Sequence, residues 1–238
     1  MNGFSQSLRQ KRKAGFIPVI PDIKLRSPKE GELFKGRDPV AAARLMAQLG
    51  APALSVVTEV RDFGGSLKLL EQVANAVNVP VLRKDFINTV DDLHRTKECG
   101  AAAVLLIAAR LDGDNLAKLY NQARKLSLEP LVEAHTRAEL ALAVSLEADL
   151  IGINNRDIIN LERDEGSVSH TQALAAWVPK DVLLISESGI KTPEQARTAT
   201  LAGAGAVLVG TAIWQASDPG QFYLSMCQGE TSHEPNQT

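Results

Sequence analysis

The chain has 238 residues, of which 45% are hydrophobic, and carries a formal net charge of −2 with a pI near 6.1. This charge gives no reason to expect a nucleic acid or a membrane as partner. No apolar run reaches the ~18 residues of a membrane span, and the N-terminus lacks the apolar segment of a secretory signal. Cys99 and Cys227 lie far apart without metal-ligand spacing, so we expect reduced thiols in a cytoplasmic protein.

Short apolar runs alternate with helical patterns along the whole chain. The runs are rich in Val, Ile and Leu and apolar on both faces, which is typical of parallel strands covered by helices. The predicted strands are Pro18–Ile23, Ala53–Val57, Pro80–Leu82, Ala103–Ile107, Pro130–Val132, Leu150–Ile153, Leu183–Ile185 and Ala206–Val209. The predicted helices are Pro39–Leu49, Ser66–Val77, Thr89–Glu98, Asp114–Leu126, Thr136–Leu146, Ser167–Trp177, Thr192–Ala202 and Pro219–Met226.

Several helix boundaries are marked by specific residues. Asp38 and Thr192 each precede a proline, which is the pattern of an N-cap followed by a proline in the first helical position. Gly50, Gly100 and Gly203 lie just beyond helix ends, where a left-handed residue is favoured. These signals support the helical assignments independently of hydrophobic periodicity.

The alternation of strand and helix predicts one (β/α)₈ TIM barrel over residues 18–228, an α/β fold. Residues 1–17 are expected to form a short N-terminal stub, and residues 229–238 a polar tail that is disordered. The alternative is an open doubly wound sheet. No G-x-G-x-x-G follows the first strand, which argues against that alternative.

Polar and ionisable residues follow five of the predicted strands, where each apolar run passes into a loop. A charged group at the end of a buried strand is costly unless it has a role. Only a closed ring brings the ends of the first, third, fifth, sixth and seventh strands together, at one mouth of the barrel. The residues are Asp22, Lys24, Lys84, Glu133, Asn154, Arg156, Glu187 and Ser188.

Seven short motifs together resemble the indole-3-glycerol-phosphate synthase family, in that family's order and spacing. Each motif alone is weak, but the set is specific and spans residues 18–228. The motifs are IKLRSP at 23–28, FGGS at 63–66, PVLRKDFI at 80–87, LVEAH at 131–135, IGINNRD at 151–157, SESGI at 186–190 and LVGTA at 208–212.

The resemblance implies a (β/α)₈ barrel that uses neither a metal nor an organic cofactor. It implies a carboxy-lyase of tryptophan biosynthesis that closes the indole ring of 1-(2-carboxyphenylamino)-1-deoxyribulose 5-phosphate, with loss of carbon dioxide and water. Ring closure converts a ketone into a hydroxyl, so an acid must protonate the carbonyl oxygen, and by resemblance this acid is Lys84. Lys24 would face the substrate carboxylate, and Glu133 would serve as base, or as acid–base partner, in the loss of water.

Other roles follow from the same resemblance. Asn154 would bond the sugar hydroxyls, and Glu187 and Ser188 would position the substrate and the lysines. The phosphate requires backbone N–H groups in the last two loops of the barrel. The residues expected on the binding side are Ser27, Lys29, Phe86, Gly189, Gly210 and Thr211. Arg156 either supports the phosphate or pairs with Asp157 or Glu187, and we favour the pairing role.

Three features depart from the family pattern. Asp22 stands where the family has a glutamate that pairs with the lysine at position 84. Because aspartate is one methylene shorter, its carboxylate would lie roughly 1 Å further from that lysine. If nothing compensates, this displacement would lower the rate on the order of 100-fold. Lys29 replaces a serine beside the expected phosphate. The segment before the first strand is short, and its basic run (Arg9, Lys11–Lys13) is either a solvated helical face or a shortened lid.

Two alternatives therefore remain open for the function. One is another barrel lyase or isomerase that acts on a different phosphorylated substrate, and the other is a non-catalytic phosphate-binding barrel. The charged residues of the mouth favour an enzyme, because unpaired charges there do not stabilise a scaffold. We expect a phosphorylated small molecule as the only ligand, and a monomer or weak homo-oligomer.

Overall fold

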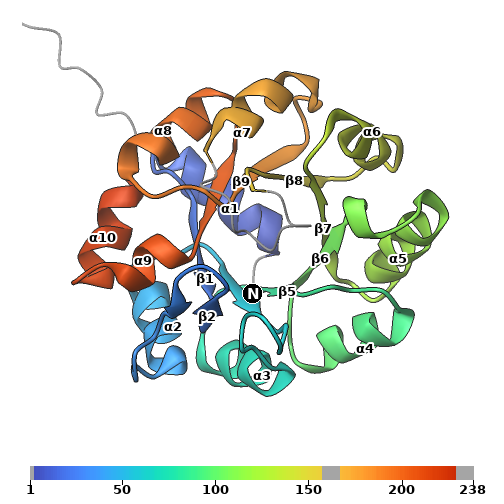
Figure 1. Cartoon of the computed structure of the whole chain (residues 1–238). Helices are drawn as coiled ribbons and strands as arrows, with labels where there is room; N and C mark the ends of the chain where they lie inside the picture. Colours follow the sequence, from blue (N-terminus) through green and yellow to red (C-terminus); the bar gives the residue numbers. More distant parts are fainter. Residues whose placement is uncertain (1–2, 157–166, 229–238) are drawn as a thin grey trace, which may run out of the picture.

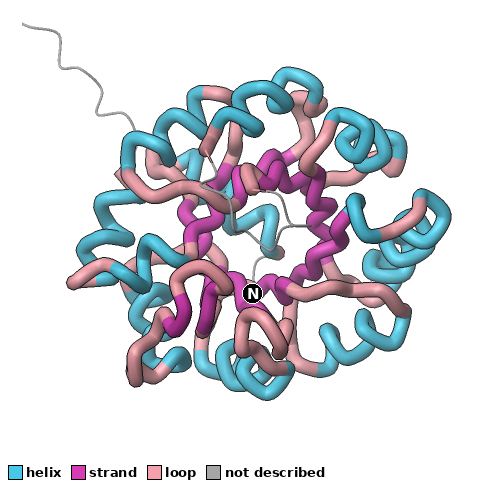
Figure 2. The backbone as a smooth tube through the Cα atoms, in the orientation of Figure 1, coloured by secondary structure: helices cyan, strands magenta, loops and turns pink. Residues whose placement is uncertain are grey.

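Eight parallel strands close into a barrel surrounded by helices in the computed structural model of the protein, which describes residues 3–156 and 167–228 (Figures 1 and 2). The first strand pairs with both the second and the last, which closes the ring and confirms the predicted (β/α)₈ barrel over the open sheet. The strands are β1 (Val19–Ile23), β4 (Leu54–Val57), β5 (Val81–Lys84), β6 (Ala103–Ile107), β7 (Glu129–Ala134), β8 (Leu150–Asn154), β9 (Leu183–Glu187) and β10 (Ala206–Val209).

The predicted helices form the outer layer. Asp38 and Thr192 cap their helices as expected, and Gly50, Gly100 and Gly203 adopt positive φ angles of 86°, 81° and 119°. The helices are α2 (Pro39–Gln48), α3 (Leu67–Ala76), α4 (Val90–Glu98), α5 (Gly113–Lys125), α6 (Arg137–Ser145), α7 (Ser169–Leu174), α8 (Pro193–Leu201) and α10 (Pro219–Met226). None of the helices in the described ranges is both long and apolar enough to span a membrane.

Some boundaries and short elements differ from the sequence-based expectation. The predicted helix Ser167–Trp177 is shorter and ends in the 3₁₀ turn η2 (Ala175–Trp177). A second 3₁₀ turn, η1 (Ala108–Arg110), follows β6. The hairpin of β2 (Arg26–Ser27) and β3 (Gly31–Glu32) and helix α9 (Thr211–Gln215) were not predicted either. The hairpin and α9 both follow barrel strands, so they shape the mouth.

Four of the barrel strands extend further than predicted. β5 continues to Lys84, β7 through Glu133, β8 to Asn154 and β9 to Glu187. We had expected these polar residues in the loops that follow the strands, and that expectation is wrong. Because they belong to strands, the hydrogen-bonded barrel itself fixes their positions.

The N-terminal stub contains the helix α1 (Phe4–Lys13), which lies against the amino end of the barrel. Phe4 and Leu8 are fully buried in the apolar cluster inside the barrel, and in Figure 1 α1 is seen through the ring of strands. Arg9 donates a hydrogen bond to the carbonyl of Asp181, which precedes β9, and Lys11 to that of Gly50, which precedes β4. The helix therefore plugs the end opposite the mouth, and the possibility that it acts as a lid is wrong.

Candidate active site

Lys84 lies between two buried carboxylates at the carboxyl end of the barrel. Its Nζ donates hydrogen bonds to Oε2 of Glu133 at 3.1 Å and to Oε2 of Glu187 at 3.2 Å. The three residues come from β5, β7 and β9, and each is at least 92% buried. Opposite charges attract one another more strongly in such surroundings than on the surface, whereas removing them from water costs solvation energy, and all three residues belong to strands of the barrel.

One of the two carboxyl groups, that of Glu187, has a strongly raised pKa. Burial is the main cause, the Lys84 ammonium opposes it and the charge of Glu133 adds to it, and together these effects raise the pKa of Glu187 to about 8. At neutral pH Glu187 is therefore mostly protonated. A neutral carboxyl group at Glu187 suits this buried, low-dielectric setting.

A glycine of β8 makes room for Glu187. A Cβ atom built on Gly152 would lie 2.0 Å from Oε1 of Glu187 and 3.1 Å from its Cδ. The absence of a side chain at Gly152 is thus a requirement of the cluster, and sequence reasoning missed it. The glycine lies inside the IGINNRD motif, where it interrupts an otherwise apolar strand; that interruption was the available signal.

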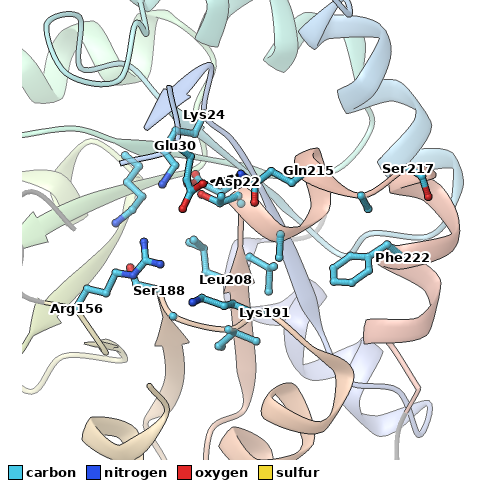
Figure 3. A pocket seen from close by; sticks show the side chains of 18 residues that line it. Asp22, Lys24, Glu30, Arg156, Ser188, Lys191, Leu208, Gln215, Ser217 and Phe222 are labelled. Atoms are coloured by element: carbon cyan, nitrogen blue, oxygen red, sulfur yellow. Dashed lines mark hydrogen bonds between the residues drawn. The ribbon is translucent and has the colours of Figure 1, made fainter. Parts of the chain in front are cut away.

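Two pockets meet at Lys84. One is a cavity of about 400 Å³ whose lining includes Asp22, Lys24, Lys84, Arg156 and Ser188 (Figure 3). The other is small and mostly apolar. Its lining combines Asp22, Lys24 and Lys84 with Val57, Glu59, Phe63, Asp85, Phe86, Leu105 and Ile107.

The shared lining residues lie where a reacting centre could contact both pockets. Lys24 is 95% buried, and its Nζ lies 5.6 Å from the centre of the Phe63 ring. Asp22 is also buried, and its carboxylate packs against Gly210, since a Cβ atom there would lie 3.3 Å from Oδ2 of Asp22. An apolar pocket beside a polar cavity suits a ligand with one aromatic end and one charged end.

The cavity is bounded by the last two loops of the barrel. Gly189, Gly210 and Thr211, which the sequence analysis assigns to phosphate binding, line it together with Ser188, which was expected to position the substrate and the lysines. Ser188 and Gly189 both have positive φ angles, 63° and 70°. A serine in the left-handed region is strained, and such strain is concentrated at functional sites.

Other predicted site residues take different positions. Asn154 is fully buried, and its Oδ1 accepts a hydrogen bond from the backbone N–H of Arg156. Arg156 lines the cavity, while Asp157, one of the two partners suggested for it, lies outside the described residues. Ser27 is buried in the hairpin and Lys29 is exposed at its turn, and neither is among the residues that line the cavity.

Asn155 is a further residue that the sequence analysis missed. Its Nδ2 donates hydrogen bonds to the carbonyls of Glu187 and Ser188 and to the hydroxyl of Ser186, at 2.9, 3.2 and 2.9 Å. Its Oδ1 accepts from the N–H and hydroxyl of Thr171. The residue thereby joins β8, β9 and α7 behind the mouth and supports the strained turn at Ser188.

Comparison with known proteins agrees with this geometry. The sequence model of indole-3-glycerol phosphate synthase matches residues 1–226. The indole-3-glycerol phosphate synthases of Pyrococcus furiosus and Thermococcus kodakarensis are 41% and 40% identical over 228 residues, which cover 96% of this chain and 98% of each relative. The one from Nocardioides sp. is 43% identical over 207 residues, which cover 87% of this chain and 78% of that relative. The chain belongs to the indole-3-glycerol phosphate synthase family.

Family membership confirms the resemblance drawn from the seven motifs. Indole-3-glycerol phosphate synthases are decarboxylating lyases of tryptophan biosynthesis that act on a phosphorylated small molecule. Of the two atypical residues, Asp22 in β1 and Lys29 in the hairpin that follows, only Asp22 is among the residues that line the cavity. The adjacent Glu30 lines the cavity instead.

Proposed function

We propose that this protein closes the indole ring of 1-(2-carboxyphenylamino)-1-deoxyribulose 5-phosphate and releases carbon dioxide and water. The observation that carries the proposal is the position of Lys84, where an apolar pocket and a polar cavity meet, with its Nζ held by two buried carboxyl groups. In this arrangement the aromatic ring occupies the apolar pocket beside Phe86, and the phosphate lies at the far end of the cavity.

Lys84 acts as the acid in ring closure. As the ring carbon that bears the carboxylate attacks the ketone, the Lys84 ammonium gives a proton to the carbonyl oxygen, which becomes a hydroxyl. Loss of carbon dioxide then returns the bonding electron pair to the ring. The contacts with Glu133 and Glu187 hold the ammonium in place, and positioning of this kind contributes strongly to rate.

The remaining step is the loss of water from the new hydroxyl. Glu133 removes the proton from the ring carbon next to nitrogen, and Lys24 supplies a proton to the leaving hydroxyl. Before that step Lys24 faces the substrate carboxylate. Asn154 bonds the sugar hydroxyls, and Asp22 holds the lysines from the β1 side.

The phosphate binds at the loops that follow β9 and β10. Gly189, Gly210 and Thr211 contribute backbone N–H groups, and glycine allows the phosphate to approach the backbone closely. Ser188 lies between this site and the reacting centre. Arg156 lines the same cavity and adds a positive charge that favours the anion.

A fluorescence assay for indole-glycerol phosphate tests the proposal, with purified protein and the carboxyphenylamino substrate. We expect turnover by the wild type, and we expect Lys84→Ala to lose it while retaining its affinity for inorganic phosphate. Lys118→Ala, at an exposed lysine of α5, is the matched control and should behave as the wild type. If Lys84→Ala keeps more than about a tenth of the wild-type rate, the assignment of Lys84 as acid is wrong.

A further inference from the structure

A carboxylate lies in the wall of the cavity that we assign to the phosphate. Glu30 lies at the turn of the β2–β3 hairpin and lines the cavity together with Gly189, Gly210 and Thr211. Figure 3 shows its side chain directed into the cavity from the hairpin side, with Ser188 and Lys191 on the opposite side. An acid is unexpected in a site for an anion, so this position calls for a physical explanation.

A specific contact holds Glu30 in this place. Its Oε2 accepts a hydrogen bond of 3.0 Å from Nε2 of Gln215, the last residue of α9 (Figure 3). The bond joins the first loop of the barrel to the last, 185 positions apart in the sequence. The carboxylate therefore belongs to the cavity wall.

A fixed negative charge at this place must weaken the binding of an anion. Two like charges repel with an energy inversely proportional to their distance and to the local dielectric constant, and because Glu30 is exposed, water moderates this repulsion. The repulsion grows with the charge of the ligand, so a dianion is affected more strongly than a monoanion. It also falls as salt is added.

We propose that Glu30 is a specificity residue that lowers the affinity of the cavity for doubly charged phosphate. This inference rests on the proposed function, because it assumes that the phosphate of the substrate and product occupies this cavity. The positive groups of the mouth bind the phosphate, and Glu30 limits how tightly it is held. The limit favours release of the product and disfavours head groups with more negative charge, such as pyrophosphate.

The variant Glu30→Gln tests this role, because an amide oxygen can still accept the bond from Gln215 while the charge is removed. We expect the dissociation constant for inorganic phosphate, measured by calorimetry, to fall about threefold to tenfold. The gain should shrink at high salt. It should be larger at pH 8 than at pH 6 for phosphate, whose second ionisation lies between these values. It should be constant for sulfate, which stays a dianion.

Glu32→Gln is the matched control, since Glu32 lies on the same hairpin but not in the lining of the cavity, and we expect no change in phosphate affinity. If Glu30→Gln binds phosphate as weakly as the wild type, or more weakly, Glu30 only anchors the hairpin and the inference is overturned. If the wild type turns over the substrate but Glu30→Gln shows no gain in phosphate affinity, the proposed function stands and the inference about Glu30 is overturned. If the wild type binds no phosphate, the assigned phosphate site is wrong, and the inference about Glu30 is overturned with it.

Discussion

Gly152 offers the sharpest test of how the Lys84 cluster works. In Gly152→Ala, the added methyl group would begin 2.0 Å from Oε1 of Glu187, whereas an ordinary contact is 3.4 Å or more, so the carboxyl group must retreat by about 1.4 Å. Glu187 is fully buried and has little space to rotate without lengthening its 3.2 Å bond to Lys84. We expect the cluster to lose this bond in the variant.

The consequences differ in size for activity and stability. A displacement of about 1 Å at a positioned catalytic group lowers the rate on the order of 100-fold. Overpacking in a closely packed interior lowers the free energy of unfolding by about 1–3 kcal/mol, which would lower Tm by roughly 3–10 °C for a chain of this size. Steady-state kinetics and thermal unfolding followed by circular dichroism measure the two effects separately.

Two further variants make the interpretation specific. Glu187→Asp withdraws the carboxyl group by one methylene, so Gly152→Ala should add little further loss in that background, which is a strong departure from additivity. Gly113→Ala is the control, because a Cβ atom there meets nothing closer than 3.9 Å, and it should leave activity unchanged. The reasoning is refuted if Gly152→Ala alone stays within about twofold of the wild-type rate.

Three other predictions concern separate parts of the molecule. The folded-state pKa of Glu187 is raised to about 8 from an ordinary value of 4.5, so its contribution to stability is fully present below about pH 4.5 and is lost as pH rises through 8. Tm measured from pH 5 to 9 should therefore fall more steeply for the wild type than for Glu187→Gln. Parallel curves for the two proteins would contradict this. Leu8→Ala should lower the free energy of unfolding by about 3 kcal/mol and leave kcat at 25 °C within about twofold, whereas a large loss of kcat would mean that α1 influences the mouth. Asp22→Glu should raise synthase activity, and adding Lys29→Ser should raise it further; if the wild type is already fast and Asp22→Glu slows it, the shorter carboxylate is an adaptation within the usual function.

The sequence predicted the barrel because the forces that form it are local and repetitive. Strands buried on both faces must be apolar throughout, and each helix begins and ends at residues with defined capping chemistry, such as Asp38 and Gly50. The site was predicted to the extent that charged residues interrupt these apolar runs. Lys84, Glu133 and Glu187 were each visible as such an interruption.

The sequence did not predict where β5, β7, β8 and β9 end, because a polar residue after an apolar run is indistinguishable from the start of a loop. Lys84 lies inside the barrel in β5, where its ammonium contacts Glu133 and Glu187, and both partners are distant in sequence. The plug was missed for a similar reason. Phe4 and Leu8 alone are buried in a helix that is otherwise polar, and the apolar opening they fill exists only once the barrel has closed.

The residues that stabilise the barrel and the residues assigned to the chemistry lie at opposite ends of it. At the mouth, a left-handed Ser188 and a buried ammonium with two carboxyl groups are arrangements that destabilise a fold relative to an apolar interior. At the opposite end, Phe4 and Leu8 fill the barrel with apolar side chains, and the basic residues of α1 bond carbonyl groups that precede the strands. Because the same strands run between both ends, apolar packing at one end can hold the strained, charged geometry of the other in place.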